Sequence, residues 1–202
     1  MRGPLKHVID GAFPVHTLLS GPASGVTAAR FLGEILDEPD LLTMDMGGTS
    51  TDVCLVVGGQ PSFFRERKVA GHPVKLDSLG VQSIGAGGGS IINVDRGGFL
   101  QVGPESTGAE PGPACYGRGG TRPTITDAHV VLGSLNSEHL LGGRMPIEAQ
   151  RSHDAIADLG GRLGLSPRET ASGVISVVVA NMVRAIRLVS VQRGHDPRDY
   201  AL

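Results

Sequence analysis

The sequence predicts an α/β protein, with a mixed sheet, β-hairpins and flanking helices. Three observations support this class. Apolar residues recur at helical spacing from Ser20 to Leu36, a short apolar run from Leu41 enters a glycine-rich loop, and a long apolar helical stretch begins at Pro167. The 31 glycines and 13 prolines lie in short clusters between these segments. Such clusters are typical of a backbone that must turn tightly or approach a ligand closely.

Helical spacing of apolar residues predicts four helices, over residues 20–36, 127–133, 146–164 and 167–193. The last is the clearest, because Ser166 and Glu169 match a capping box and Gly194 suits the position after the helix. This helix is apolar nearly all round, so we expect it to be largely buried.

Short apolar runs separated by glycine pairs predict strands and hairpins. Residues 52–57 and 62–69 flank Gly58-Gly59, and residues 91–95 and 99–102 flank Arg96-Gly97-Gly98. Residues 103–123 show no periodicity and predict a long loop with a structural or binding role. The final residues, 199–202, look like the start of a further strand.

Composition excludes several classes of protein. Hydrophobic residues make up 40% and charged residues 19% of the chain, and the formal net charge is −2. This balance favours neither a nucleic-acid partner nor an anionic membrane surface. We identify no signal peptide and no apolar window approaching the ~20 residues needed to span a bilayer. With only Cys54 and Cys115, a disulfide framework is not expected, and a cytoplasmic location is predicted.

The segment MDMGGTSTDV (Met44–Val53) is the most informative part of the sequence. An acid, Asp45, ends an apolar strand, and a second acid, Asp52, follows the loop. Tight backbone turns allow amides to face a polyphosphate, hydroxyls donate to phosphate oxygens, and acids hold hydrated Mg²⁺. We therefore predict phosphate-binding residues between the two acids: Gly47, Gly48, Thr49, Ser50 and Thr51. An ordinary hairpin turn is the alternative.

No GxxxxGK[ST] motif occurs, so this is not a Walker A loop. The segment instead resembles the phosphate loops of the actin, sugar-kinase and heat-shock-chaperone superfamily. Five ordered segments extend the resemblance over nearly the whole chain: LSGPASGVTAA (19–29), MDMGGTSTDV (44–53), SIGAGGGSI (83–91), GPACYGRGGTRPTITDA (112–128) and MVRAIRLVSVQRGHDPRD (182–199). Together they resemble the large subunit or domain of the hydantoinase/oxoprolinase family. That family includes N-methylhydantoinase A subunits, 5-oxoprolinases and ATP-dependent acetone and acetophenone carboxylases.

The resemblance implies an actin-like ATPase fold, ATP with Mg²⁺, and a second subunit or domain of the hydantoinase B type. It implies catalytic and Mg²⁺-anchoring roles, through water, for Asp45 and Asp52. Residues 1–202 are then expected to be one ATPase lobe that is incomplete at both ends, with a phosphate-loop part (41–133) and a helical part (146–202). We expect the segment alone to be inactive.

The implied function is an ATP-dependent amidohydrolase that opens a cyclic amide or imide, of hydantoin or 5-oxoproline type, through phosphoryl activation. Two alternatives stay open: a ketone carboxylase subunit of the same family, and a noncatalytic nucleotide-dependent interaction module.

The second glycine cluster, GAGGGS, does not match a dinucleotide-binding fingerprint, because Ser90 stands at the last glycine position and a strand follows. Within the family pattern, it is expected to line the cleft. The expected cleft residues are Gly85, Gly87, Gly88, Gly89, Ser90 and, in the later loop, Arg118.

Other candidates favour structural roles. Cys115 has no base at a recognisable spacing, so a buried thiol is preferred over a nucleophile. Asp127 and His129 are two residues apart, which does not place them side by side on a helix for metal binding. Arg184 and Arg187 are expected to be ion-paired or to extend to solvent rather than to reach phosphate.

Overall fold

The computed structural model describes residues 20–64, 67–69, 72–74 and 78–202. Within them the chain forms two compact units. The first unit contains the described parts of residues 1–45 and 52–82, together with residues 188–202. The second contains residues 46–51 and 83–187. Each unit combines strands with helical segments, so the predicted mixed α/β class is confirmed.

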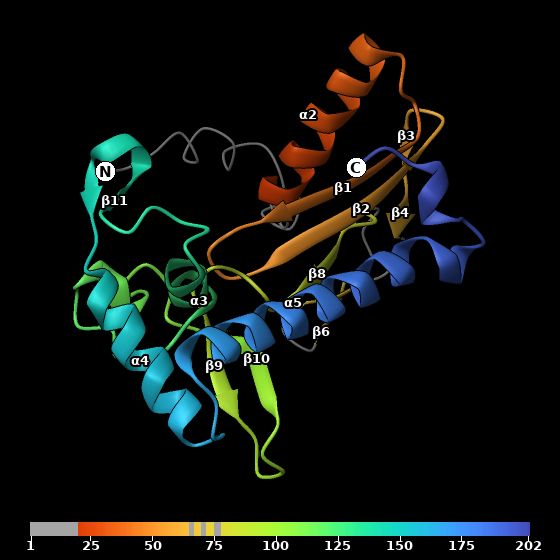
Figure 1. Ribbon diagram of the computed structural model, residues 1–202. Helices are drawn as coiled ribbons and strands as arrows, with labels where there is room; N and C mark the ends of the chain where they lie inside the picture. Colours follow the sequence, from red (N-terminus) through yellow and green to blue (C-terminus); the bar gives the residue numbers. More distant parts are fainter. Residues whose placement is uncertain (1–19, 65–66, 70–71, 75–77) are drawn as a thin grey trace. The chain divides into compact units, whose positions relative to one another are not determined.

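The first unit contains a small sheet with helix α2 (Ser20–Leu36) beside it, in red in Figure 1. β1 (Leu41–Met46), β2 (Thr51–Val57) and β3 (Gln60–Pro61) pair in sequence order, and β8 (Gln82–Ile84) also pairs with β2. The core of this unit joins Val26 of α2 to the sheet residues Cys54 and Val56 and to Val81. Burial raises the pKa of the Cys54 thiol, in keeping with a small buried hydrophobe.

The β2–β3 hairpin turns on Gly58 and Gly59, as the glycine pair predicts. Val57 pairs with Gln60 across the turn, and the two glycines have φ of +55° and +73°. Two consecutive positive φ angles define a turn whose twist matches that of the flanking strands, and glycine adopts them without a steric penalty.

The strand expected over residues 62–69 is not one continuous element. β4 (Phe63–Phe64) pairs with β7 (Ser78–Leu79), and β5 (Arg67–Val69) pairs with β6 (His72–Val74). The run therefore divides between two different partners, and residues 65–66 lie outside the described residues.

The strand start predicted at the end of the chain is present at Ala201. This residue forms a parallel bridge with Leu41, and the Leu42 amide donates to the Ala201 carbonyl oxygen at 2.7 Å. A parallel bridge therefore lies beside the antiparallel β2–β3 hairpin in the first unit.

The second unit contains a long hairpin of β9 (Ser90–Val94) and β10 (Leu100–Ser106), in which Leu100 pairs with Val94. Helices α3 (Ile125–Leu132), α4 (Ala149–Gly161) and α5 (Pro167–Val189) gather around it (Figure 1). Their apolar faces share one core with the hairpin, made of Ile92, Val102, Ile125, Ala128, Ile156, Leu159, Ala171, Val174 and Val178.

The connections contain short elements. In the described part of the chain these include the 3₁₀ helices η2 (Ala114–Tyr116), η3 (Leu141–Gly143), η4 (Val191–Arg193) and η5 (Pro197–Asp199). β11 (His139–Leu140) and β12 (Met145–Pro146) form a small antiparallel pair. The loop expected over 103–123 is shorter than predicted, because β10 continues to Ser106 and η2 interrupts the remainder.

The predicted capping box of α5 is confirmed. The Ser166 hydroxyl and amide both donate to the Glu169 carboxylate, at 2.6 and 2.9 Å, and the Glu169 amide donates to the Ser166 hydroxyl at 3.3 Å. These hydrogen bonds lower the pKa of Glu169. They satisfy backbone donors that the first turn of a helix leaves without partners.

The expectation that α5 is largely buried is wrong for this chain. Its buried apolar residues follow one stripe, while Val179 and Val183 are 50% and 42% exposed. The described residues supply packing partners for only one face of the helix.

The segment Pro167–Arg193 is, among the described residues, the one helix long and apolar enough to cross a membrane by length and composition. The prediction that no window approaches this threshold is therefore incorrect. One face of α5 packs into the core of the second unit, and core helices pass the same test. The length and composition of this helix are therefore not evidence that it crosses a membrane.

Candidate functional site

The loop between β1 and β2 is the centre of the candidate phosphate site. It joins two neighbouring strands, and the Gly47 amide donates to the Ser50 carbonyl oxygen at 2.9 Å. The predicted strand–loop–strand form is confirmed. Residues 46–49 are exposed, and the amides of Gly48, Thr49 and Ser50 make no hydrogen bond to any described residue. The Gly47 amide is engaged within the loop, so an interaction of this amide with phosphate would compete with that bond.

The glycine-rich loop 85–90 is bonded directly to this loop. The amide of Gly88 donates to the Gly47 carbonyl oxygen at 3.0 Å, and the amide of Gly89 donates to the Gly48 carbonyl oxygen at 2.6 Å. A Cβ added to Gly87 would lie 2.5 Å from the Thr49 nitrogen. Only glycine therefore permits this approach of the two backbones.

Thr51 differs from its predicted role. Its side chain is fully buried, and its hydroxyl donates to the Ala86 carbonyl oxygen at 2.5 Å. The hydroxyl therefore links the two loops, and it cannot donate to a phosphate oxygen while that bond is intact. The other two hydroxyl residues of the loop, exposed Thr49 and half-buried Ser50, retain this capacity.

The structure also alters the expected role of the glycine-rich loop. Gly87, Gly89 and Ser90 are buried, and the Gly87 amide donates to the Ser90 hydroxyl at 2.8 Å. The amides of Gly87, Gly88 and Gly89 all have partners inside the protein, so they are not free to bind a ligand. Gly85 is exposed and Gly88 is half-buried, and for these two a place on the cleft wall stays a prediction.

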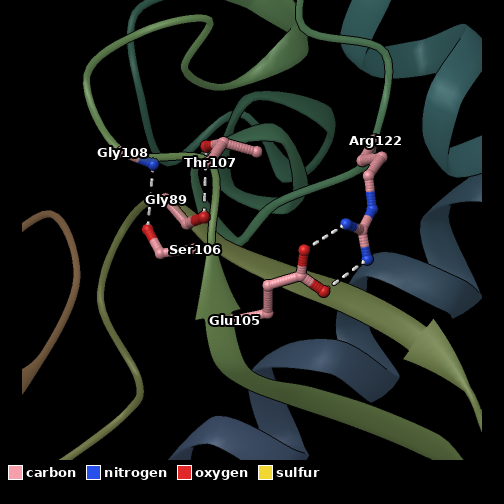
Figure 2. Close-up of polar contacts among 6 residues, drawn as sticks. All are labelled: Gly89, Glu105, Ser106, Thr107, Gly108 and Arg122. Atoms are coloured by element: carbon pink, nitrogen blue, oxygen red, sulfur yellow. Dashed lines mark hydrogen bonds and ion pairs between the residues drawn. The ribbon is translucent and has the colours of Figure 1, made fainter.

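Two further threonines, Thr107 and Thr126, donate hydrogen bonds to carbonyl oxygens of the glycine-rich loop. The amide and hydroxyl of Thr107 both donate to the Gly89 carbonyl oxygen, at 2.9 and 3.2 Å. Figure 2 shows the bond from the hydroxyl. The amide and hydroxyl of Thr126 both donate to the Gly88 carbonyl oxygen, each at 2.9 Å. Figure 2 also shows the exposed two-point ion pair of Arg122 with Glu105 near this bond.

Asp45 and Asp52 line one cavity of about 710 Å³ in the first unit. Asp45 is exposed and Asp52 is half-buried. A Cβ added to Gly25 of α2 would lie 3.7 Å from a carboxylate oxygen of Asp45. Among the described residues, no group of three or more His, Cys, Asp or Glu side chains gathers as a metal site. Glu38 lines the same cavity, and carboxylates grouped in this way fit an ion such as Mg²⁺ that keeps several of its own waters.

Arg118 lies in the loop after η2 and is exposed, with its guanidinium 5.9 Å from the centroid of the Tyr116 ring. Among the described residues, Arg118 forms no hydrogen bond or ion pair with the glycine-rich loop, so its place on the cleft wall stays a prediction.

Asp127 is the most heavily bonded side chain of the second unit. It is fully buried and accepts hydrogen bonds from five donors: the amides of Ala114, Cys115 and Thr124 and the hydroxyls of Thr124 and Ser152. It thereby joins η2, the start of α3 and helix α4. Burial and the Asp127 carboxylate raise the pKa of Cys115 to about 12. A protonated, buried thiol is a poor nucleophile, which supports the structural interpretation of Cys115.

The remaining candidates also have structural surroundings. His129 Nδ1 lies 2.8 Å from the Ser134 hydroxyl, while the Asp127 carboxylate faces η2, so the two side chains do not form a metal pair. Burial lowers the pKa of His129. Arg184 and Arg187 are exposed on α5, and Arg187 lies in the last turn, where a positive charge is favourable.

Sequence reasoning missed the roles of Thr107, Thr126 and Asp127. For Asp127 a signal existed, because Thr124-x-x-Asp127 before an apolar run matches the capping-box pattern also present at Ser166. The structure shows that box at the start of α3. For Thr107 and Thr126 no local pattern existed, because their partners are carbonyl groups remote in the sequence.

Fold and site together define a mixed α/β protein in which a Gly-Gly-Thr-Ser loop is supported by a second glycine-rich loop. The family model described as hydantoinase/oxoprolinase matches residues 10–202. The chain belongs to the hydantoinase/oxoprolinase family.

Individual relatives extend this result. The chain is 43% identical to caprolactamase subunit alpha of Pseudomonas jessenii, over 93% of this chain and 27% of that protein. It is 34% identical to 5-oxoprolinase 1 of Arabidopsis thaliana, over 92% of this chain and 16% of that protein. The nucleotide-free structure of acetone carboxylase superposes with a TM-score of 0.84 at 35% identity, over 91% of this chain and 26% of that chain. The chain therefore spans about a quarter or less of the length of these relatives.

Proposed function

We propose that this chain is the phosphate-loop part of an ATP-dependent enzyme with an actin-like fold, which opens a cyclic amide or imide by phosphoryl activation. The observation that carries the proposal is the loop 47–50. The glycine-rich loop donates hydrogen bonds to two carbonyl oxygens of this loop. The amides of Gly48, Thr49 and Ser50 have no partners among the described residues. The relative at 43% identity is named a caprolactamase subunit, which favours a lactam as substrate.

The residues of the loop have distinct tasks in this proposal. The amides and the hydroxyls of Thr49 and Ser50 bind phosphate oxygens and orient the terminal phosphoryl group. Positioned donors of this kind stabilise the charge that develops during phosphoryl transfer. Asp45 and Asp52, which bracket the loop in the sequence, would hold a hydrated Mg²⁺. That ion would neutralise part of the phosphate charge when bound.

A second candidate function is a ketone carboxylase subunit, because the acetone carboxylase structure shares the fold of this chain at a TM-score of 0.84. The two reactions differ in the group that receives the phosphoryl, an amide oxygen in one and an enolate oxygen in the other. The names of both caprolactamase and acetone carboxylase relatives include the word subunit. We accordingly propose a partner of the hydantoinase B type, and a cytoplasmic location.

The test of catalysis is Asp45→Asn in the longer protein that contains this chain. We expect ATP turnover to fall by at least about a hundredfold, because loss of one group that positions the transferred phosphoryl removes several kcal/mol of stabilisation. The control is Asp158→Asn, since Asp158 is an exposed acid on α4 that lies outside both the loop and the cavity. Near-normal turnover in Asp45→Asn, measured by phosphate release, would remove Asp45 from the site.

The substrate class follows from stimulation of ATP turnover. Lactams and hydantoins that stimulate it support the hydrolase, and ketones with bicarbonate that stimulate it support the carboxylase. Binding of ATP without turnover under either condition would indicate the noncatalytic module instead.

A further inference from the structure

The backbone of the glycine-rich loop has every carbonyl group from Gly85 to Gly89 hydrogen-bonded. Hydroxyl groups supply most of the donors: Ser90 to Gly85, Thr51 to Ala86, Thr126 to Gly88 and Thr107 to Gly89. The Gly87 carbonyl oxygen accepts from the Ser90 amide at 2.8 Å. A loop of glycines is intrinsically flexible, so this network supplies the rigidity that its sequence lacks.

One peptide group in this loop connects Thr126 to the phosphate loop. The Gly88 carbonyl oxygen accepts from the Thr126 amide and hydroxyl, and the amide on the same peptide group, that of Gly89, donates to the Gly48 carbonyl oxygen. The Thr126 amide belongs to the first turn of α3, where backbone donors lack partners within the helix. The amide and the hydroxyl of Thr126 therefore together fix the plane of the Gly88–Gly89 peptide.

Hydrogen bonds to peptide carbonyl groups also orient the phosphate loop. Its Gly47–Gly48 and Gly48–Thr49 peptides each receive a hydrogen bond at the carbonyl oxygen from the glycine-rich loop. In a trans peptide the N–H points away from the C=O. The amides of Gly48 and Thr49 are therefore directed away from the glycine-rich loop, and neither has a partner among the described residues. Successive outward amides of this kind form an anion-binding concavity.

We propose that Thr126 is a positioning residue for nucleotide phosphate: its hydroxyl fixes the Gly88–Gly89 peptide, which orients the Gly48–Thr49 amide toward the phosphate. This inference rests on the proposed function, because it assigns the loop 47–50 to ATP. The glycine-rich loop then serves as the support of the phosphate loop. In this role Thr126 acts on the phosphate through the two loops.

The experiment compares Thr126→Val with Thr126→Ser in the longer protein that contains this chain. Valine keeps the shape and removes the hydroxyl donor, whereas serine keeps the donor. The matched control is Thr170→Val, because Thr170 is a buried threonine whose hydroxyl donates to a carbonyl oxygen, that of Ser166, also at 2.9 Å. Thr170 lies on α5 and is bonded to neither loop.

Two readouts are needed. The first is the KM for ATP together with the Kd of Mg-ATP by calorimetry, and the second is hydrogen exchange in peptides covering residues 44–55 and 83–92 without nucleotide. For Thr126→Val we expect KM and Kd to rise roughly five- to tenfold, with a smaller change in kcat and faster exchange in both peptides, as loss of one buried hydrogen bond predicts. Thr126→Ser should restore wild-type values, and Thr170→Val should leave them unchanged.

The outcomes separate the two proposals. Unchanged exchange in both peptides for Thr126→Val overturns the positioning role, whether or not ATP binds. A serine variant as impaired as the valine variant overturns it too, because the hydroxyl would not be the cause. If the wild-type protein binds no ATP, the proposed function fails, and faster exchange in Thr126→Val still supports the coupling of the two loops. If Thr126→Val does not fold, Thr107→Val tests the same loop through the Gly89 carbonyl, with a smaller expected effect at 3.2 Å.

Discussion

At the scale of single residues, Asp127 organises the largest number of polar groups in the described chain around one carboxylate. Its two oxygens accept from two hydroxyls and three amides that come from η2, α3 and α4. Burying a carboxylate is unfavourable unless such donors compensate it. The adjacent residue, Thr126, bonds the glycine-rich loop. Neighbouring residues at the start of α3 thus hold two loops of the second unit.

Replacement of Asp127 should destabilise the protein strongly. Asp127→Ala leaves two buried hydroxyls and three buried amides without their acceptor, and we expect a loss of at least about 3 kcal/mol, as for other buried charged partners. The control is Asp158→Ala on the exposed surface of α4. Denaturant unfolding of both variants measures the difference. Equal midpoints for the two would show that the Asp127 network contributes little.

At the scale of elements, the capping box of α5 can be tested through pH. Ser166→Ala removes the hydroxyl that lowers the pKa of Glu169, and we expect a loss of about 1 kcal/mol at neutral pH, as for other N-caps. The pKa of Glu169 is lower in the folded than in the unfolded protein. The stabilisation by the Ser166–Glu169 hydrogen bonds is therefore fully present above the ordinary carboxyl pKa. It is lost as the pH falls through the pKa that Glu169 has in the folded protein. The difference between wild type and Ser166→Ala should therefore shrink in acid.

Ser176→Ala is the comparison for this experiment. Ser176 is exposed in the middle of the same helix, and its hydroxyl donates to the Ser172 carbonyl oxygen. Alanine is the better helix former, so this change should be neutral or slightly stabilising. Thermal unfolding between pH 3 and pH 7 measures the change in stability caused by each of the two substitutions. A pH-independent effect of Ser166→Ala would contradict the role assigned to Glu169.

At the scale of the whole molecule, the chain corresponds to about a quarter or less of the length of its relatives, and apolar surface is exposed on both units. On α2 the exposed side chains are Phe31, Leu32, Ile35 and Leu36, and on α5 they are Val179 and Val183. Exposed apolar patches of this kind are typical of surfaces that pack against other protein.

We therefore predict that residues 1–202 alone bind Mg-ATP weakly or not at all and hydrolyse no lactam. Phosphoryl transfer requires groups positioned around the whole terminal phosphate, and this segment supplies one loop toward that arrangement. Calorimetric titration of residues 1–202 with Mg-ATP tests this, with the ATP-dependent caprolactamase of Pseudomonas jessenii as the positive control. A micromolar Kd or measurable turnover for the segment would show that the site is complete within it.

The sequence by itself determined much of the local structure, because the signals involved lie within a few residues of one another. The Gly58-Gly59 turn, the capping box of α5 and the strand–loop–strand form of residues 44–53 are all confirmed as predicted. The exposed face of α5 was not predicted, because apolar composition shows that a face can be buried without showing which partner covers it.

Only the tertiary structure decided the roles of the hydroxyl groups. Thr51 is predicted from sequence to bind phosphate and instead bonds Ala86, while Thr126 carried no signal and bonds Gly88. The residue types are the same, and the partners are remote in sequence for both. A hydroxyl donates to whichever acceptor the fold brings within about 3 Å. Its role is therefore decided by the packing of the loops, not by the motif in which it stands.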